Sequence, residues 1–137
     1  MVRNSNLEVK KSIIPGAGNG LFTKVKIKKG TIIGLFGGEL ITDDEADNRP
    51  DSYGWFVDLG NGFSIDCYKN DAKANYANDA QGLIKTRLKN NCNIQQDTDK
   101  DGNIFVCLIA EVDIPKGSEI FVSYGDSYWE TFKNNYE

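Results

Sequence analysis

The side chains of this 137-residue chain that could do chemistry are tyrosines, asparagines, lysines and carboxylates, because the chain contains no histidine. Without histidine, Ser-His-Asp and Cys-His nucleophilic catalysis are excluded. The three cysteines, Cys67, Cys92 and Cys107, are widely spaced and form no Cys-x-x-Cys pair. We therefore expect neither a zinc site nor a disulfide framework, and interpret these cysteines as buried free thiols.

Two motifs are similar to ligand-binding loops, but their neighbours argue against that interpretation. Gly16-Ala17-Gly18-Asn19-Gly20 is similar to a dinucleotide loop, yet Leu21–Val25 is strand-like where a helix should follow. Asp97–Ile104 matches the first eight positions of a calcium loop, but position twelve is Leu108 instead of glutamate. We interpret the second motif as a solvated hairpin tip with Asp-Gly turn chemistry, and weak calcium binding stays open as an alternative. No metal site is expected.

The elements that must position these residues are mostly short strands. Phe63–Cys67 alternates apolar and polar residues, as a half-buried strand does. Ile104–Ile109 is apolar on both faces, which indicates a central strand covered on both sides. Further strands are expected at Leu21–Val25, Thr31–Phe36, Glu39–Ile41, Trp55–Leu59 and Glu119–Ser123.

Helical signals are few. Thr42-Asp43-Asp44-Glu45 is a capping box and predicts a helix that ends near Pro50. Asp71–Ala77 and Ser127–Asn135 predict short helical segments. With 14 glycines and no linker or low-complexity segment, the sequence predicts one mainly β domain over residues 1–137.

The pattern V-x-I-x-K-G-[S/T]-x-I occurs twice, at Val25–Ile33 and at Val112–Ile120. Each copy predicts an extended segment, a Lys-Gly turn in which glycine adopts positive φ, and a new strand from the hydroxyl residue onward. We therefore expect two equivalent turns.

The charge of the chain limits its partners. A net charge of −4 disfavours direct nucleic-acid binding and suits a basic protein or peptide partner. No apolar run approaches the roughly 18 residues of a membrane span, and the N-terminus has no signal-peptide pattern. We expect a soluble, intracellular protein that does not bind membranes.

Three separated segments carry a more specific signal. They are Gly18–Phe22 followed by Ile27–Gly30, then Tyr76-Ala77-Asn78-Asp79 followed by Asn91-Cys92-Asn93, and finally Gly117–Asp126, which reads G-S-E-I-F-V-S-Y-G-D. In this order they resemble the SET family, whose segments read G-x-G-[V/L]-F, R-[F/Y]-x-N-H-x-x-x-P-N and G-E-E-[L/I]-x-x-x-Y. The resemblance extends from about Leu7 to Trp129.

The resemblance implies an S-adenosylmethionine-dependent methyltransferase acting on lysine side chains of proteins. It implies a β-clip-like fold of several small curved sheets with a threaded, pseudoknot-like C-terminal region, in which Tyr76–Asp79 passes close beneath the segment of Tyr124. For the cofactor, the resemblance implies that Gly18, Asn19 and Gly20 contact it through backbone groups. Asn78 and Asp79 would hold its adenine end beside Tyr76, and Trp129 or Tyr128 would cover it. For the reaction, the resemblance implies that Tyr124 lies at the methyl-transfer centre and that Tyr53, or alternatively Trp55, lines the lysine channel.

The chain also departs from the family pattern. Asp79 stands where the family has histidine, and Asn75 where it has arginine. Twelve residues separate Asn78 from Asn91, more than the family usually has, and the cysteine-rich zinc-binding flanks are absent. Two hypotheses follow: a nuclear or cytoplasmic protein lysine methyltransferase with a histone tail or another protein as substrate, or a non-catalytic SET-like domain that binds a basic peptide or the cofactor.

Overall fold

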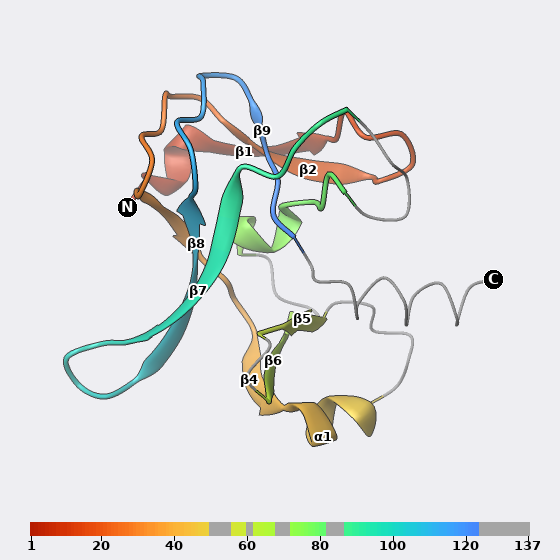
Figure 1. Ribbon diagram of the computed structural model, residues 1–137, viewed down its shortest axis with the longest axis vertical. Coiled ribbons are helices and arrows are strands. Elements are labelled where there is room, and N and C mark those ends of the chain that lie inside the picture. The colour runs from red at the N-terminus through yellow and green to blue at the C-terminus, as the bar shows by residue number, and fades with distance from the viewer. Residues whose placement is uncertain (50–55, 60–61, 68–71, 82–86, 124–137) are drawn as a thin grey trace.

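The computed structural model describes residues 1–49, 56–59, 62–67, 72–81 and 87–123, which form three small antiparallel sheets (Figure 1). The first sheet has the order β1-β2-β9, the second β3-β8-β7 and the third β4-β6-β5. The strands are β1 (Leu7–Lys11), β2 (Asn19–Thr23), β3 (Ile32–Leu35), β4 (Glu39–Thr42), β5 (Phe56–Asp58), β6 (Phe63–Asp66), β7 (Cys92–Thr98), β8 (Ile104–Ala110) and β9 (Glu119–Ile120). The mainly β architecture predicted from the sequence is confirmed.

The helical elements of the described residues are short. They are the 3₁₀ helices η1 (Asn4–Asn6) and η2 (Lys73–Tyr76) and the α-helix α1 (Asp43–Asp47). The expected helical segments near Asp43 and within Asp71–Ala77 are thus confirmed, whereas Ser127–Asn135 lies outside the described residues. None of the described helices is long and apolar enough to cross a bilayer.

Strand β8 is the central strand of its sheet, as its apolar sequence predicts. Val106 and Leu108 are buried on one face; on the other, Cys107 is buried while Phe105 and Ile109 are half-buried. The expected cover on both faces is therefore found at the centre of the strand and is incomplete toward Phe105 and Ile109. Strands β1 and β7 were not predicted, and the mostly polar β7 owes its place to seven residue pairs with β8.

The tip of the β7–β8 hairpin explains the calcium-like motif. Asp99 Oδ1 accepts hydrogen bonds from the backbone N–H of Asp101 at 2.9 Å and of Asn103 at 3.0 Å. The bonds from Asn103 and Asp101 lower the pKa of Asp99, because they stabilise its charged form. The carboxylate organises the turn, which confirms the hairpin interpretation of this motif.

The two copies of the Lys-Gly pattern pair with each other. Ile27 and Ile114 form an antiparallel bridge, in which their N–H groups donate to each other's carbonyl oxygens at 2.9 and 2.7 Å. Gly30 and Gly117 have φ values of 86° and 85°, and β3 and β9 begin two residues after these glycines. The expected equivalence of the two turns is confirmed.

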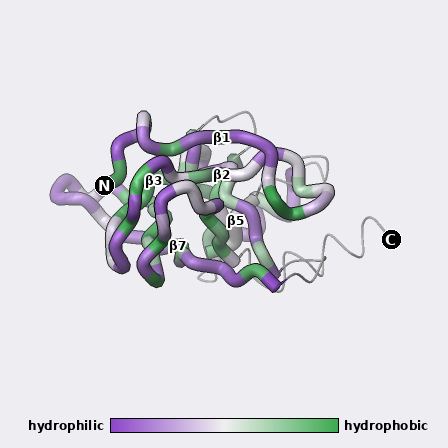
Figure 2. The backbone as a smooth tube through the Cα atoms, turned by 90° about the horizontal axis from the view of Figure 1, so that it is seen from above, coloured by the Kyte–Doolittle hydropathy of each residue, from purple (hydrophilic) through white to green (hydrophobic). Residues whose placement is uncertain are grey.

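The main core lies between the first two sheets and η2. Its buried side chains include Leu21 and Ile120 from the first sheet, Ile33 and Leu108 from the second and Ala74 from η2. A smaller cluster of Ile65, Cys67 and Val106 connects the second sheet to the third. Hydrophobic stretches gather in the interior, and many outer connections are hydrophilic (Figure 2).

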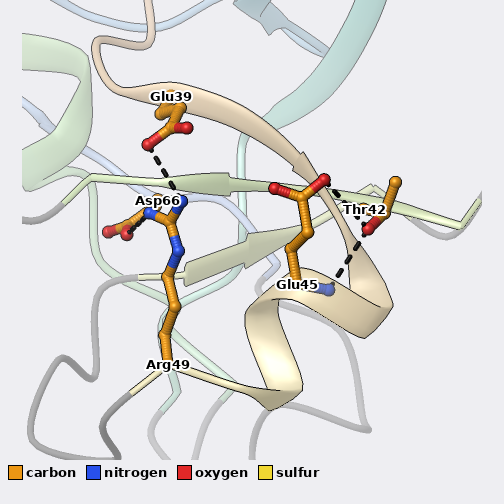
Figure 3. A network of polar contacts seen from close by, with 5 residues as sticks. All are labelled: Glu39, Thr42, Glu45, Arg49 and Asp66. Atoms are coloured by element: carbon orange, nitrogen blue, oxygen red, sulfur yellow. Dashed lines mark hydrogen bonds and ion pairs between the residues drawn. The ribbon is translucent and has the colours of Figure 1, made fainter.

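Beyond β4 the chain enters α1 through the expected capping box (Figure 3). Thr42 Oγ1 accepts a hydrogen bond from Glu45 N–H and donates one to Glu45 Oε1, both at 3.2 Å. Two residues beyond α1, Arg49 pairs with Glu39 of β4 and with Asp66 of β6, which are opposite one another in the sheet. These carboxylates raise the pKa of Arg49. One arginine thus ties the end of α1 to both strands.

Removing the cap should weaken this region without changing the fold. Thr42→Ala leaves an N–H of the first helical turn without its acceptor and should lower the free energy of unfolding by about 1 kcal/mol. Thr42→Ser keeps the hydroxyl and should stay within about 0.5 kcal/mol of the wild type. Urea titrations of the three proteins measure this difference, and equal midpoints for the two variants would contradict the cap.

Candidate functional site

Segments far apart in the sequence meet at the end of β9. Phe121 and Val122, which follow β9, form parallel bridges with Asn78 and Cys92 respectively, so the C-terminal strand passes between these two segments. Val122 N–H donates to the carbonyl oxygen of Asn78 at 2.8 Å. The threaded arrangement expected from the family resemblance is confirmed as far as Val122, two residues before Tyr124.

Glu119 is the residue that joins these segments, and the sequence analysis gave it no role. It is only 3% exposed. Its Oε1 accepts a hydrogen bond from Ile13 N–H at 2.8 Å, and its Oε2 accepts from Ser12 Oγ at 2.7 Å and from Asn78 Nδ2 at 3.3 Å. These three donors compensate for the lost hydration of the carboxylate. The sequence feature that could have identified Glu119 is its place in the G-S-E-I segment, where the family pattern has glutamate.

Gly20 is required because Glu119 lies directly against it. A Cβ at Gly20 would be 2.3 Å from Glu119 Oε2 and 3.1 Å from Asn78 Nδ2. Glycine is required at position 18 for a different reason, because its φ of 74° lies in the left-handed region. The Gly18 carbonyl oxygen accepts a hydrogen bond from Ser12 N–H at 2.8 Å. The glycine-rich segment therefore closes the β1–β2 hairpin and leads into strand β2, which confirms that it is no dinucleotide loop.

The structure brings four of the predicted cofactor-binding residues together. Asn78 Nδ2 donates to the carbonyl oxygen of Asn19 at 3.0 Å, between Gly18 and Gly20. Gly18 and Asn19 are exposed, and Asn78 is half-buried. A ligand at this place would meet backbone atoms of the hairpin and the Asn78 carboxamide on one surface.

Asp79 has a different set of contacts from Asn78. It is 8% exposed, and its Oδ1 accepts from Gln81 N–H at 2.8 Å and from Asn90 Nδ2 at 3.0 Å. Asn90 Oδ1 in turn accepts from Ala80 N–H at 2.8 Å. Asp79 and Asn90 are the two ends of the twelve-residue span that distinguishes this chain from the family pattern. Their contact closes the span at its base.

Asn91 fixes the next strand to the C-terminal segment. Its Oδ1 accepts from Phe121 N–H at 2.9 Å, and its Nδ2 donates to the Glu119 carbonyl oxygen at 3.1 Å. One side chain therefore satisfies two backbone groups beside the candidate site, in the second of the three segments that resemble the family.

Asn75 and Tyr76 are the last two residues of η2. Asn75 Oδ1 accepts from Gly37 N–H at 3.1 Å and Asn75 Nδ2 donates to the Gly37 carbonyl oxygen at 3.0 Å. Tyr76 is half-buried and packs against the main core. Asn75 thereby joins η2 to the connection between β3 and β4, and its role in the described structure is positional.

Three predicted site residues, Tyr53, Tyr124 and Trp129, lie outside the described residues, as do the alternatives Trp55 and Tyr128. Their proposed roles stay predictions.

The thiols and acidic groups of the described structure form no reactive or metal-binding cluster. Cys67, Cys92 and Cys107 are buried and free, as expected. Burial raises the pKa of Cys67 and of Cys92 to about 12, with smaller contributions from Asp66 and Glu111 respectively. Within the described ranges, no three His, Cys, Asp or Glu side chains are grouped so that they could hold a metal ion.

Comparison with known proteins gives one result that covers most of these elements. The family model of the SET domain matches residues 18–125, which is more than half of the chain. No curated protein sequence matches this chain.

The close approach at Gly20 gives a test of the site geometry. Gly20→Ala places a methyl group against the Glu119 carboxylate and should lower the free energy of unfolding by about 1–3 kcal/mol. Gly34→Ala is a matched control, because its Cβ would meet Ala74 Cβ at an ordinary 3.8 Å. Chemical denaturation measures both variants, and equal effects would show that Glu119 does not lie against Gly20.

Proposed function

Because the chain belongs to the SET-domain family, we propose that it transfers the methyl group of S-adenosylmethionine to lysine side chains of proteins. The family consists generally of protein lysine methyltransferases that use this cofactor. The observation that carries the proposal is the meeting of Gly18–Gly20, Asn78 and the segment before Tyr124 around the buried carboxylate of Glu119.

The residues at this place suit the chemistry of the cofactor. Among the described residues, Asn78 Oδ1 accepts no hydrogen bond, so it can accept one from an amino group such as that of adenine. Glu119 accepts only from neutral donors and forms no ion pair within the described chain. Its carboxylate favours a positively charged ligand on the neighbouring surface. When bound, S-adenosylmethionine supplies a methyl group on a positively charged sulfur.

The protein's own task is then to orient and neutralise the lysine. Free lysine has a pKa of about 10.4, so the amine must lose a proton before it can attack the methyl carbon. An apolar channel beside a cation lowers that pKa, and Tyr53 is proposed to line the channel. The Tyr124 hydroxyl is proposed to hold the neutral amine in line with the methyl group. The leaving group is a neutral thioether that needs no acid catalyst, so the absence of histidine is no obstacle.

The proposed substrate is a basic segment of a protein, and a histone tail is the main candidate. The net charge of −4 supports attraction of such a segment, and α1 presents Asp43, Asp44 and Glu45 in its first turn. This proposal places the protein where histones are made or used, in the nucleus or cytoplasm.

The non-catalytic alternative rested on Asn75 and Asp79. Both side chains have positional contacts with neighbouring backbone or with Asn90, which weakens the argument for lost activity.

Cofactor binding can be tested without any substrate. S-Adenosylmethionine should raise the melting temperature, because a ligand that prefers the folded state stabilises it. Asn78→Ala should raise Kd roughly five- to tenfold, as expected for the loss of one hydrogen bond of about 1 kcal/mol. Asn93→Ala, at an exposed position of β7, is the matched control and should leave Kd unchanged. Calorimetry that detects no binding at millimolar cofactor would refute the cofactor assignment.

The proposed transfer centre can be tested at Tyr124. Tyr124→Phe removes one oxygen and keeps the ring, and should lower the rate of methyl transfer by about 10²–10³. Tyr53→Phe should reduce the rate less and change the number of methyl groups added. Mass spectrometry of the best protein substrate, with a thermal melt of each variant, measures both effects. Wild-type turnover by the Tyr124 variant would show that the active centre lies elsewhere.

A further inference from the structure

The two Lys-Gly turns lie side by side at the end of the molecule opposite α1 (Figure 1), and the lysines that they carry are exposed. We call this group the lysine patch; all of its members are exposed, and they are Lys24, Lys26, Lys28, Lys29 and Lys116. Four come from the first copy of the repeated pattern and its preceding residue, and one from the second copy.

Backbone hydrogen bonds hold the two halves of the patch together. The Ile27–Ile114 bridge pairs the segments, and Gly117 N–H donates to the Thr23 carbonyl oxygen at 2.8 Å, immediately before Lys24. Lys26 and Lys28 flank Ile27, which is 2% exposed. Because side chains alternate along an extended segment, these two lysines lie on the outer face.

The patch is not neutralised by the rest of the described structure. No ion pair there involves any of its five lysines. Two acidic side chains, Glu111 and Asp113, occur in the neighbouring segment, and Asp113 Oδ1 already accepts a hydrogen bond from Lys29 N–H at 2.8 Å. The patch therefore carries an excess of positive charge in a chain whose net charge is −4.

The residue composition of the lysine patch limits the classes of macromolecule that it can bind. Residues 24–30 and 111–118 contain neither arginine nor an aromatic residue. Protein interfaces are depleted in lysine and enriched in aromatic residues and arginine, so a folded protein is a poor match. Single-stranded nucleic acids are bound largely by stacking on aromatic rings, which the patch cannot supply. Lysines as point charges suit phosphate groups of a regular backbone.

We propose that the lysine patch binds the phosphate backbone of a nucleic-acid duplex, without sequence preference. This differs from the expectation set by the net charge, because the fold separates the charges: the acidic residues of α1 lie at the other end of the molecule (Figure 1). The inference goes beyond the proposed methyl transfer, and its test does not require that activity.

The test compares two triple variants that change the net charge equally. Lys26, Lys28 and Lys116 are replaced by glutamine in the patch variant, and the exposed Lys11, Lys89 and Lys100 in the control. Fluorescence anisotropy with a labelled 20-base-pair DNA duplex gives Kd between 50 and 200 mM salt. The slope of log K against log salt should flatten by about 2–3 in the patch variant, since each lost phosphate contact removes about one unit. Its Kd at 50 mM salt should rise at least tenfold, against less than threefold for the control.

Several results would overturn the proposal. They are no binding by the wild type at 50 mM salt, equal weakening of both variants, or tighter binding to a single strand of the same length. Stronger binding to vesicles containing phosphatidylserine than to the duplex would assign the patch to a membrane surface. Thermal melts of the three proteins show whether a loss of binding comes from unfolding.

Discussion

The Glu119 carboxylate accepts hydrogen bonds from the loop after β1 and from the segment after η2, while its own backbone lies in β9. A buried carboxylate without donors would cost several kcal/mol, so these segments are stable only in the one arrangement that supplies them. The same carboxylate leaves no space for a side chain at Gly20. The surface on which Gly18, Asn19 and Asn78 meet is therefore a consequence of how one acidic group is hydrogen-bonded beneath it.

Among the described residues, the third sheet is joined to the rest by the small apolar cluster of Ile65, Cys67 and Val106 and by a series of polar contacts. Asn75 holds the peptide of Gly37, and a Cβ at Gly38 would lie 2.3 Å from the Asp66 carbonyl oxygen, so β4 enters its sheet through a tight backbone crossing. Asp66 then meets Arg49 beyond α1 (Figure 3). A continuous path of contacts thus runs from η2, beside the candidate cofactor surface, to the acidic helix.

Sequence patterns predicted the features that depend on neighbouring residues. The capping box at Thr42 and the Asp99 turn are local, and both were found where residue order indicates them. The role of Glu119 could not be predicted in this way, because two of its donors are more than 100 residues distant and the third, Asn78, is 41 residues distant. An isolated glutamate has the pattern of a surface residue. Polar β7 was missed for the same reason: its strand conformation comes from pairing with β8 and not from its composition. The site residues Gly18, Asn19, Gly20 and Asn78 were identified only through the family resemblance of their spacing.

The pairing of β2 with β9 also determines when this protein can fold during its synthesis. Ser12 and Glu119 are 107 positions apart, and Leu21 of the first hairpin has Ile120 as its strand partner. As the ribosome releases the chain, the β1–β2 hairpin is made about a hundred residues before β9, so Leu21 and the Ser12 hydroxyl have no native partners until β9 has been synthesised. Contacts of such long range make folding slow relative to helical domains of this size. Until β9 has been made, the edge of β2 that pairs with it is therefore unpaired, and an unpaired strand edge favours aggregation.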